Sequence, residues 1–482
     1  MNIRAVTHTI CYLIGVIALA MLAGAGISIY YGEAAAAKSL IYSTVISLLA
    51  ALLCGFLTRG EFHLTRRDGF GIAVFGWIFV ALFGALPFLL SGVITGFIPA
   101  VFETMSGITT TGASVLTDLE TLPHGILFWR AMTHFFGGMG VLVLCVAILP
   151  FLTVGGMQIY RAEVPGPDKE RLTPRISTTA KWLWGTYILF CILQTILLML
   201  GGMSLFDAWC HTCATMATGG FSTRTASVGA YQSVYIEIVM IMFMFLAGTN
   251  FALHLRLLRG KSPLSYFRDE EFRWYFFLWL AAGLLLTLSI RGRNSGSWLS
   301  SLRPAFFQCT SIMTTTGFVT ADFNQWSSTA KAVLLVLMFV GGCASSTGGG
   351  VKVIRLLTAG KALLRELLLY IRPNAVKSIS IGGRNVGQPT ILNICIFLLI
   401  FVLIFVLGSL VMTAFTPDLA TATSSTIACL GNIGPGLGAV GATENYAAIP
   451  DAGKAVLILI MLLGRLELFT VIVLFLPEFW RK

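Results

Sequence analysis

Long apolar segments separated by short polar loops recur along the whole chain. A helix needs about 20 predominantly apolar residues to cross a hydrocarbon core. Segments that reach or approach this length cover residues 8–30, 39–57, 69–92, 126–153, 180–203, 232–258, 272–290, 325–370 with an interruption, 388–414 and 452–478. The pattern predicts ten transmembrane spans, and an even number of spans places both termini on the same side of the membrane.

A shorter semi-polar stretch, too short to cross, precedes the fourth, sixth, eighth and tenth of these spans. Each stretch is followed by a loop that contains glycine, and the anchor residues of the loops are Gly112, Gly220, Gly317 and Gly434. The successive spacings are 108, 97 and 117 residues. A period near one hundred residues, with a span, a short segment and a span in each copy, indicates an internal repeat.

A second marker recurs in phase with the first. Glycines follow each loop by roughly one helix length, at Gly137-Gly138, Gly248, Gly341-Gly342 and Gly464. Small residues at such positions let neighbouring helices approach closely. Two independent markers in the same phase support a true repeat rather than a coincidence.

The repeat predicts an all-α polytopic membrane protein. Two N-terminal spans are followed by four span–pore helix–span units, arranged with pseudo-fourfold symmetry around a central ion pore. The predicted division is 1–60 for the N-terminal pair, 61–165 for repeat 1, 166–265 for repeat 2, 266–375 for repeat 3 with the interrupted helix, and 376–482 for repeat 4.

Composition and charge agree with a membrane protein. Of the 482 residues, 56% are hydrophobic and only 11% are charged, and the mean hydropathy is +0.86, so the bilayer is the expected solvent. The net charge of +11 comes from basic residues that cluster in alternate loops. The positive-inside rule places these loops and both termini in the cytoplasm. Because the basic residues form no contiguous domain, we expect no nucleic-acid partner.

The four glycine-containing loops place irregular backbone at membrane depth, where N–H and C=O groups need protected partners. If the loops converge on one axis, their carbonyl oxygens form stacked rings that can replace the hydration shell of a cation. Glycine fits where a carbonyl must face the axis in a conformation that is costly for other residues. The alternative is that threonine and glycine only allow close helix packing, which accounts for one such loop better than for four in phase.

Residues 341–350 interrupt the eighth span with glycine and small polar residues, which break an apolar helix. A phosphate-binding Walker A loop is the alternative interpretation of this segment. Its spacing is wrong, because Val351 separates Gly350 from Lys352 and Val353 follows. We therefore interpret the segment as part of the membrane pathway.

Arg465 lies near the middle of the last apolar segment, where a charge is costly unless it faces protein or water. On a continuous helix Glu467 lies on nearly the opposite face, so the two side chains do not simply neutralise one another. We predict that Arg465 faces the pathway below the four loops and acts as an electrostatic barrier. A structural ion pair with another helix is the alternative.

The four loops, residues 341–350 and Gly464-Arg465-Leu466-Glu467 together resemble the TrkH family within the TrkH, TrkG and KtrB superfamily of potassium transporters. The resemblance covers essentially the full length, and the two spans before the first repeat are similar to TrkH rather than KtrB. It implies a homodimer in a bacterial cytoplasmic (inner) membrane, among membrane lipids. It also implies a cytoplasmic TrkA-like regulatory subunit with nucleotide-binding domains, so that ATP or NAD is expected on the partner and only potassium on this chain.

The resemblance also assigns site residues by position. The potassium-binding filter maps to Thr110, Thr111, Gly112, Thr218, Gly219, Gly220, Thr315, Thr316, Gly317, Asn432, Ile433 and Gly434. The intramembrane gating loop maps to Gly341, Gly342, Cys343, Ala344, Ser345, Ser346, Thr347, Gly348, Gly349 and Gly350. Because the fourth loop departs from the threonine-rich form, we expect less strict selectivity, with passage of rubidium and to some extent of sodium.

These features predict potassium uptake rather than enzymatic catalysis. The six histidines are scattered, and neither HExxH nor GxSxG occurs. A transporter with inverted repeats is disfavoured, because all four loops follow their spans in the same order. Channel-like conduction and coupling to H⁺ or Na⁺ both stay open.

Two groups of charged residues have open roles. Glu103 and Asp207 lie close to the filter loops and either draw cations to the mouth or form solvated helix ends. The basic loops near Arg171, Lys261 and Arg365 form the candidate surface for the regulatory subunit, although membrane topology alone also explains their charge.

Overall fold

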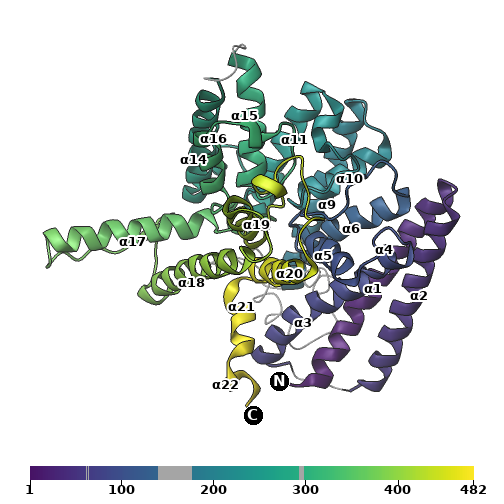
Figure 1. Ribbon diagram of the computed structural model, residues 1–482. Coiled ribbons are helices and arrows are strands. Elements are labelled where there is room, and N and C mark those ends of the chain that lie inside the picture. The colour runs from purple at the N-terminus through teal and green to yellow at the C-terminus, as the bar shows by residue number, and fades with distance from the viewer. Residues whose placement is uncertain (61, 63, 139, 141–175, 292–297, 482) are drawn as a thin grey trace.

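The computed structural model describes residues 1–60, 62, 64–138, 140, 176–291 and 298–481. The N-terminal helices α1 (Ile3–Tyr30) and α2 (Ala34–Leu57) pack together along one side of the molecule (Figure 1). Helix α1 also packs on α3 (Arg66–Gly84) and α6 (His124–Gly138). The pair therefore lies beside the rest of the bundle and in contact with its first helices.

After this pair the same order of helices occurs four times. The long first helices are α3 with its extension α4 (Leu86–Leu90), α9 (Ile176–Leu200), α14 (Glu270–Arg291) and α18 (Gln388–Met412). The short second helices are α5 (Phe97–Ile108), α10 (Leu205–Met216), α15 (Trp298–Met313) and α19 (Leu419–Leu430). The third position is taken by α6, by α11 (Val234–Ala247) and α12 (Phe251–Leu258), by α16 (Ser328–Leu337) and α17 (Val353–Ile371), and by α20 (Asp451–Arg465) and α21 (Leu468–Ile472).

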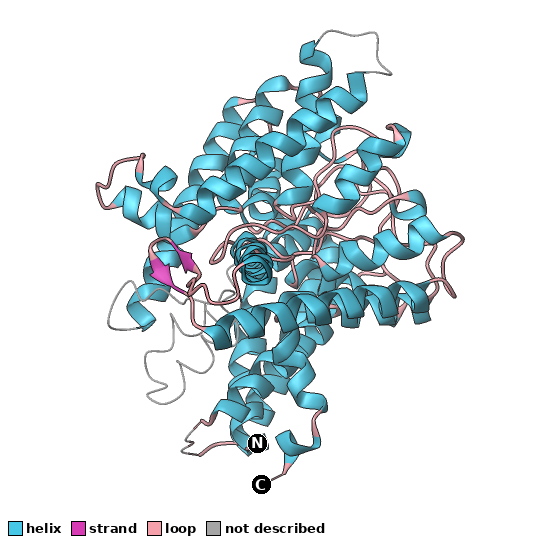
Figure 2. Ribbon diagram, turned by 90° about the vertical axis from the view of Figure 1, so that its left-hand side faces the viewer, coloured by secondary structure: helices cyan, strands magenta, loops and turns pink. Residues whose placement is uncertain are grey.

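The remaining described elements are short. They are α13 (Ser265–Arg268), α22 (Pro477–Trp480), the 3₁₀ turns η1 (Ser227–Tyr231), η2 (Phe323–Gln325), η3 (Gly438–Val440) and η4 (Val473–Phe475), and the strands β1 (Ser380–Ile381) and β2 (Arg384–Asn385). The two strands form an antiparallel hairpin in which Ser380 pairs with Asn385 (Figure 2). The described part of the chain is otherwise helix and loop, which confirms the predicted all-α class.

Six described helices are long and apolar enough to cross a membrane, and counting two bent pairs as single spans gives eight. The predicted span 126–153 extends into residues outside the described part, and the span 325–370 is divided between α16 and α17. The spans 232–258 and 452–478, expected to be continuous, bend by 101° and 118°. Both bends fall at the glycine markers, because α11 ends before Gly248 and α20 ends just after Gly464.

Side-chain caps explain where several helices begin. The Ser204 hydroxyl accepts a hydrogen bond from the Asp207 N–H at 3.0 Å at the start of α10. Asp418 accepts one from the Thr421 N–H at 2.7 Å at the start of α19. Such caps satisfy N–H groups that have no partner within the helix, and they define the entry of the chain into two of the short helices.

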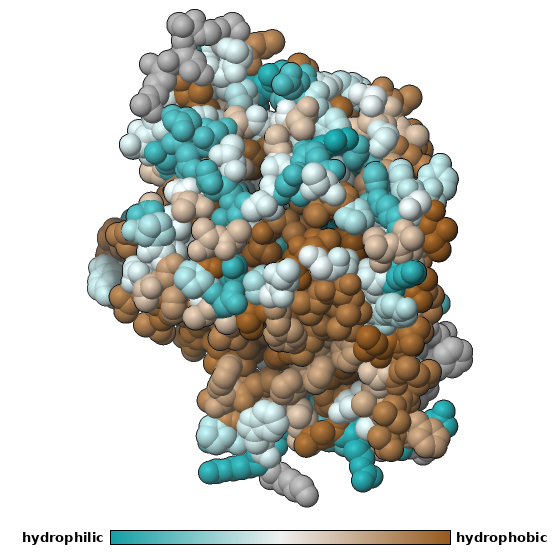
Figure 3. Space-filling model, turned by 45° about the vertical axis from the view of Figure 1, so that its right-hand side comes forward, coloured by the Kyte–Doolittle hydropathy of each residue, from teal (hydrophilic) through white to brown (hydrophobic). Residues whose placement is uncertain are grey.

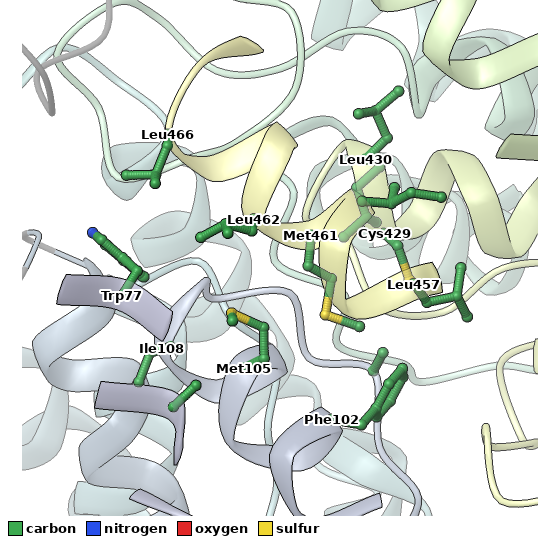
Figure 4. Close-up of a cluster of buried hydrophobic side chains, with 14 of the residues drawn as sticks. Trp77, Phe102, Met105, Ile108, Cys429, Leu430, Leu457, Met461, Leu462 and Leu466 are labelled. Carbon is green, nitrogen blue, oxygen red and sulfur yellow. The ribbon is translucent and has the colours of Figure 1, made fainter. Parts of the chain in front are cut away.

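The first and last repeats pack against each other. Met105 and Phe102 of α5 face Met461 and Leu457 of α20 in one buried cluster (Figure 4). Lipid tails are as apolar as these side chains, so close packing rather than the hydrophobic effect holds such helices together in a membrane. Contact between the two ends of the repeat series allows the four units to form a closed arrangement.

The surface and the chain ends agree with a membrane-embedded body. Hydrophobic side chains cover a broad area of the face in Figure 3, with hydrophilic side chains above it and at the lower end. Exposed leucines on the outer helices, such as Leu53 at 63% exposure, contribute to such surfaces. The two termini lie close together in both Figure 1 and Figure 2, and the Arg67 guanidinium donates to the carbonyl oxygen of Arg481.

Candidate functional site

The four glycine-containing loops have the same unusual backbone. Positive φ angles occur at the first residue of each predicted filter triplet, with φ of 53°, 55°, 59° and 54° at Thr110, Thr218, Thr315 and Asn432. They recur at the third residue, with φ of 82°, 79°, 84° and 94° at Gly112, Gly220, Gly317 and Gly434. A positive φ is rare for residues other than glycine, and especially for β-branched threonine. Strain of this kind persists where the surroundings enforce it, and here it occurs four times in equivalent positions.

The same loops meet in a closed ring. A Cβ atom placed on each glycine would clash with a carbonyl oxygen of the next loop. The distance from this Cβ atom to the oxygen is 2.0 Å from Gly112 to Gly219, 2.1 Å from Gly220 to Thr316, 2.0 Å from Gly317 to Ile433, and 2.7 Å from Gly434 to Thr111. The contacts run from the first loop to the second, third and fourth, and back to the first. Only glycine fits these four positions, and the four loops surround a common axis.

A cavity of about 130 Å³ is lined by all four of these glycines and by the loops that follow them. Thr225 lines this cavity, and Glu120 accepts a hydrogen bond from the Thr225 N–H at 2.9 Å and another from the Thr225 hydroxyl, which links the segments after the first and second loops. Burial opposes ionisation of Glu120, but these hydrogen bonds hold its pKa below the usual value. The Glu120 carboxylate therefore stays charged at neutral pH beside Thr225.

Glu103, on α5, is fully buried behind the first loop. Its carboxylate accepts hydrogen bonds from the Ser114 hydroxyl at 3.0 Å and the Val115 N–H at 2.9 Å, and it pairs with Arg130 at 2.6 Å. Arg130 also donates to the carbonyl oxygen of Ser222 at 2.9 Å, behind the second loop. The expectation of a cation-attracting or solvated Glu103 was wrong, because the buried pair joins the first two loops from behind.

Asp207, on α10, has a similar position behind the second loop. It accepts a hydrogen bond from the Thr223 hydroxyl at 2.5 Å and pairs with Arg224 at 3.2 Å. Asp207 is 7% exposed, so its charge is compensated by neighbours within the loop rather than directed at the open mouth.

The second loop differs from the others by having glycine in its central position. A Cβ atom on Gly219 would lie 2.5 Å from the Nδ1 atom of His134 on α6. The His134 ring also stacks on Phe221, with ring centroids 4.0 Å apart. The imidazole thus occupies the space that a side chain at residue 219 would need, and reasoning from the sequence missed this partner.

The fourth loop differs by having asparagine in its first position. The Asn432 amide donates to the Thr111 hydroxyl at 3.0 Å and to the carbonyl oxygen of Met461 at 3.1 Å. The Tyr446 hydroxyl donates to the carbonyl oxygen of Gly434 at 2.7 Å. The fourth loop is therefore held by side-chain hydrogen bonds, one of which reaches the first loop.

Residues 341–350 form an irregular segment between α16 and α17, directly next to the ring. The Gly349 N–H donates to the Thr315 hydroxyl at 2.7 Å. Lys352, which is 2% exposed, donates to the carbonyl oxygen of Gly348. Most of the segment lines a second cavity of about 100 Å³. Its placement beside the third loop makes it a candidate obstruction of the axis.

Arg465 lines the same second cavity. Its guanidinium donates to the carbonyl oxygen of Thr347 at 2.9 Å, and also to the carbonyl oxygens of Gly137 and Gly138. The side chain thus connects residues 341–350 to the end of α6. The guanidinium thus places a positive charge along the second cavity.

The prediction that Glu467 lies on the opposite face from Arg465 was wrong. It assumed a continuous helix, whereas α20 ends at Arg465 and Glu467 has a φ of 57°. Both side chains line the second cavity. Glu467 pairs with Arg355 of α17 at 2.7 Å, which ties the break in the last span to the helix that follows residues 341–350.

Comparisons with known proteins agree with this geometry. The sequence matches the TrkH cation transport protein family over residues 37–482. The Trk system potassium uptake protein TrkH of Salmonella typhimurium is 41% identical over 488 residues, covering 100% of both chains. The Trk system potassium uptake protein TrkG of Escherichia coli K12 is 35% identical, covering 100% of this chain and 99% of the relative. The crystal structure of the potassium transporter TrkH from Vibrio parahaemolyticus superposes with a TM-score of 0.90 at 37% identity, over 100% of both chains.

Proposed function

The chain belongs to the TrkH family of cation transport proteins, and from this membership we propose that it takes up potassium across a bacterial cytoplasmic membrane. Relatives that match it over their full length are named as potassium uptake proteins, which supports the choice of ion. The observation that carries the proposal is the closed ring formed by Gly112, Gly220, Gly317 and Gly434. A ring of backbone carbonyls suits a cation that must lose its water.

In this proposal the four loops form the selectivity filter. Potassium is coordinated by backbone oxygens of the triplets 110–112, 218–220, 315–317 and 432–434. The strained threonines and the glycines are held in place by the pairs behind the loops, such as Glu103 with Arg130. The backbone of these loops is therefore already ordered before an ion binds, so that binding costs little further conformational entropy.

Residues 341–350 act as the gate, and Arg465 acts as the barrier beside it. The support is their common position along the second cavity and the hydrogen bond from Arg465 to Thr347. The closed gate combines a physical obstruction with a positive charge. Opening requires the segment to move away from Thr315 and Arg465.

Rubidium diffraction tests the filter. Crystals soaked in a rubidium salt are expected to show anomalous peaks on the axis within the ring of Gly112, Gly220, Gly317 and Gly434, because rubidium substitutes for potassium at carbonyl sites. Added potassium should remove these peaks, whereas sodium at the same concentration should leave most of their height. Peaks confined to other parts of the molecule, with none within the ring, contradict the assignment.

The assembly is proposed to be a homodimer that binds a cytoplasmic TrkA-like subunit carrying ATP or NAD. Helix α17 projects from the body (Figure 1) and exposes Leu363, Leu364 and Leu367, an apolar face of the kind that marks an interface. Of the three basic loops proposed for the regulatory subunit, Arg171 lies outside the described residues, Lys261 is exposed, and Arg365 pairs with Glu366 at 2.6 Å.

Native mass spectrometry tests the homodimer. The wild-type protein is expected at twice the chain mass, and Leu363→Glu with Leu367→Glu is expected at the single-chain mass, because burying two carboxylates in an apolar interface is costly. Leu53→Glu on α2, where the leucine is similarly exposed, is the matched control and should stay dimeric. A wild-type protein that is monomeric contradicts the homodimer, and a dimeric α17 variant contradicts this interface.

A further inference from the structure

A single carboxylate bonds one residue within the gating loop, residues 341–350, and one residue just after it. Glu271 lies in the first turn of α14 and is 6% exposed. Its Oε1 atom accepts a hydrogen bond from the Ala344 N–H at 2.7 Å and from the Ile354 N–H at 3.1 Å. Ala344 belongs to the first half of the loop, and Ile354 lies in the first turn of α17. One oxygen atom therefore joins the backbone on both sides of the segment that faces the ring.

A carboxylate is well suited to this position. Irregular backbone at membrane depth leaves N–H groups that need partners, and one carboxyl oxygen has two lone pairs and can accept from two of them. Ile354 is near the N-terminus of α17, where free N–H groups and the helix dipole favour a negative charge. Glu271 thus serves as the cap of α17 and as the anchor of the loop at the same time.

The residues between the two anchored positions have individual contacts with surrounding elements. The Phe251 N–H donates to the carbonyl oxygen of Ser345 at 3.1 Å, and the Thr347 hydroxyl donates to that of Ala247 at 3.2 Å. Both partners lie at the bend between α11 and α12. Backbone hydrogen bonds join the base of the loop, from the Gly341 N–H to the Val351 carbonyl oxygen at 2.8 Å and from the Val353 N–H to the Gly342 carbonyl oxygen at 3.2 Å. Glu271 adds a side-chain connection above this base, between Ala344 and Ile354.

We propose that Glu271 is the positioning residue of the gate: it holds the gating loop in its closed position by joining the Ala344 and Ile354 backbones. The inference rests on the proposed function of residues 341–350 as a gate. Opening then includes release of at least one of the two N–H groups from Glu271. Loss of the carboxylate removes the connection between Ala344 and Ile354 even when Arg465 is present.

The neighbouring residue provides a matched control. Glu270 lies in the same turn of α14 but bonds to different partners, the Lys361 ammonium and the Gly382 N–H at 2.9 Å. Glu270→Ala removes a carboxylate from the same helix end without touching the loop. An effect specific to Glu271 therefore cannot come from the helix end alone.

A native cysteine reports the position of the loop directly. Cys343 is 1% exposed and precedes Ala344 in the chain. In the full-length protein, alkylation of Cys343 by N-ethylmaleimide, quantified by peptide mass spectrometry, is expected to be at least tenfold faster in Glu271→Ala than in wild type. Glu271→Asp keeps the charge but is too short to reach both N–H groups, so it should also label faster. Glu270→Ala should label at the wild-type rate.

Glu271→Gln separates anchoring from charge. Its amide oxygen can accept both hydrogen bonds, while the loss of a nearby negative charge by itself favours the reactive thiolate. Labelling within twofold of wild type supports anchoring by hydrogen bonds. The inference is overturned if Cys343 is labelled as fast in Glu271→Gln as in Glu271→Ala. It is also overturned if Glu271→Ala and Glu271→Asp are labelled as slowly as wild type.

Rubidium uptake by the same variants in proteoliposomes separates this inference from the proposed gate. Faster labelling of Cys343 together with severalfold faster uptake in Glu271→Ala supports both. Faster labelling with unchanged uptake supports the anchoring role of Glu271 and shows that residues 341–350 do not limit transport. If Glu271→Ala does not fold, Glu271→Asp and Glu271→Gln decide the matter by the same two measurements.

Discussion

Replacing Arg465 with alanine is expected to raise rubidium flux through the purified protein by at least about tenfold. The guanidinium links residues 341–350 to the end of α6 through Thr347, Gly137 and Gly138, and it places a positive charge along the second cavity. Its removal both loosens the gate and lowers the electrostatic barrier for a cation. A tenfold increase corresponds to a barrier lower by about 1.4 kcal/mol, a small part of the cost of a charge in a dry cavity.

Arg465→Lys is the control for the charge, because lysine keeps it but cannot reproduce the planar set of donors that bonds three carbonyl oxygens. We expect its flux to lie between those of wild type and Arg465→Ala. Flux is measured per folded protein, with size-exclusion elution as the check on folding. If Arg465→Ala folds normally and conducts no faster than wild type, Arg465 is no barrier, and loss of folded protein points to a structural ion pair instead.

The second large effect is expected at the ring itself. Gly112→Ser combined with Gly317→Ser should reduce potassium-selective uptake to background. Both glycines have φ above 80°, and a Cβ atom on either would lie 2.0 Å from a carbonyl oxygen of the next loop. The left-handed backbone alone costs a side chain about 1–2 kcal/mol, but the clash also forces the ring apart. Rubidium uptake with potassium and sodium as competitors measures the loss.

A matched glycine on the outside of the bundle controls for the substitution. Gly185 lies within α9, and a Cβ atom there would meet nothing within 4 Å. Gly185→Ser is therefore expected to transport like wild type. Selective uptake by a folded double variant at the wild-type rate contradicts the role of the ring, whereas uptake that continues but no longer distinguishes potassium from sodium supports it.

Much of the architecture could be predicted because it depends on local sequence. The apolar segments, the short semi-polar helices and the glycines with positive φ each leave a signal within a few residues, and repetition made that signal specific. Gly112, Gly220, Gly317 and Gly434 were grouped by the short semi-polar segments before them and by their spacing, and the structure brings them together. Their assignment as potassium ligands is still a prediction.

The parts that could not be predicted depend on partners distant in the chain. Glu103 was expected at the mouth or at a solvated helix end because it lies close to the first loop in the sequence, but its partner Arg130 comes from α6. The glycine at residue 219 had no explanation without the ring of His134. Glu271 gave no signal, since a glutamate at the start of a helix is ordinary. The bend after Arg465 was missed because the apolar run continues through it.

Ion selection by the four loops is tested by rubidium-86 uptake into proteoliposomes preloaded with potassium, for the wild-type protein, the Gly112→Ser, Gly317→Ser double variant and the Gly185→Ser control. Wild type and control are expected to show uptake that external potassium suppresses and sodium barely affects, and the double variant is expected to show only background uptake. If wild type is silent, Arg465→Ala serves as the conducting background for the same comparison. Equal, potassium-suppressed uptake by a folded double variant would contradict the claim that the four loops select the ion.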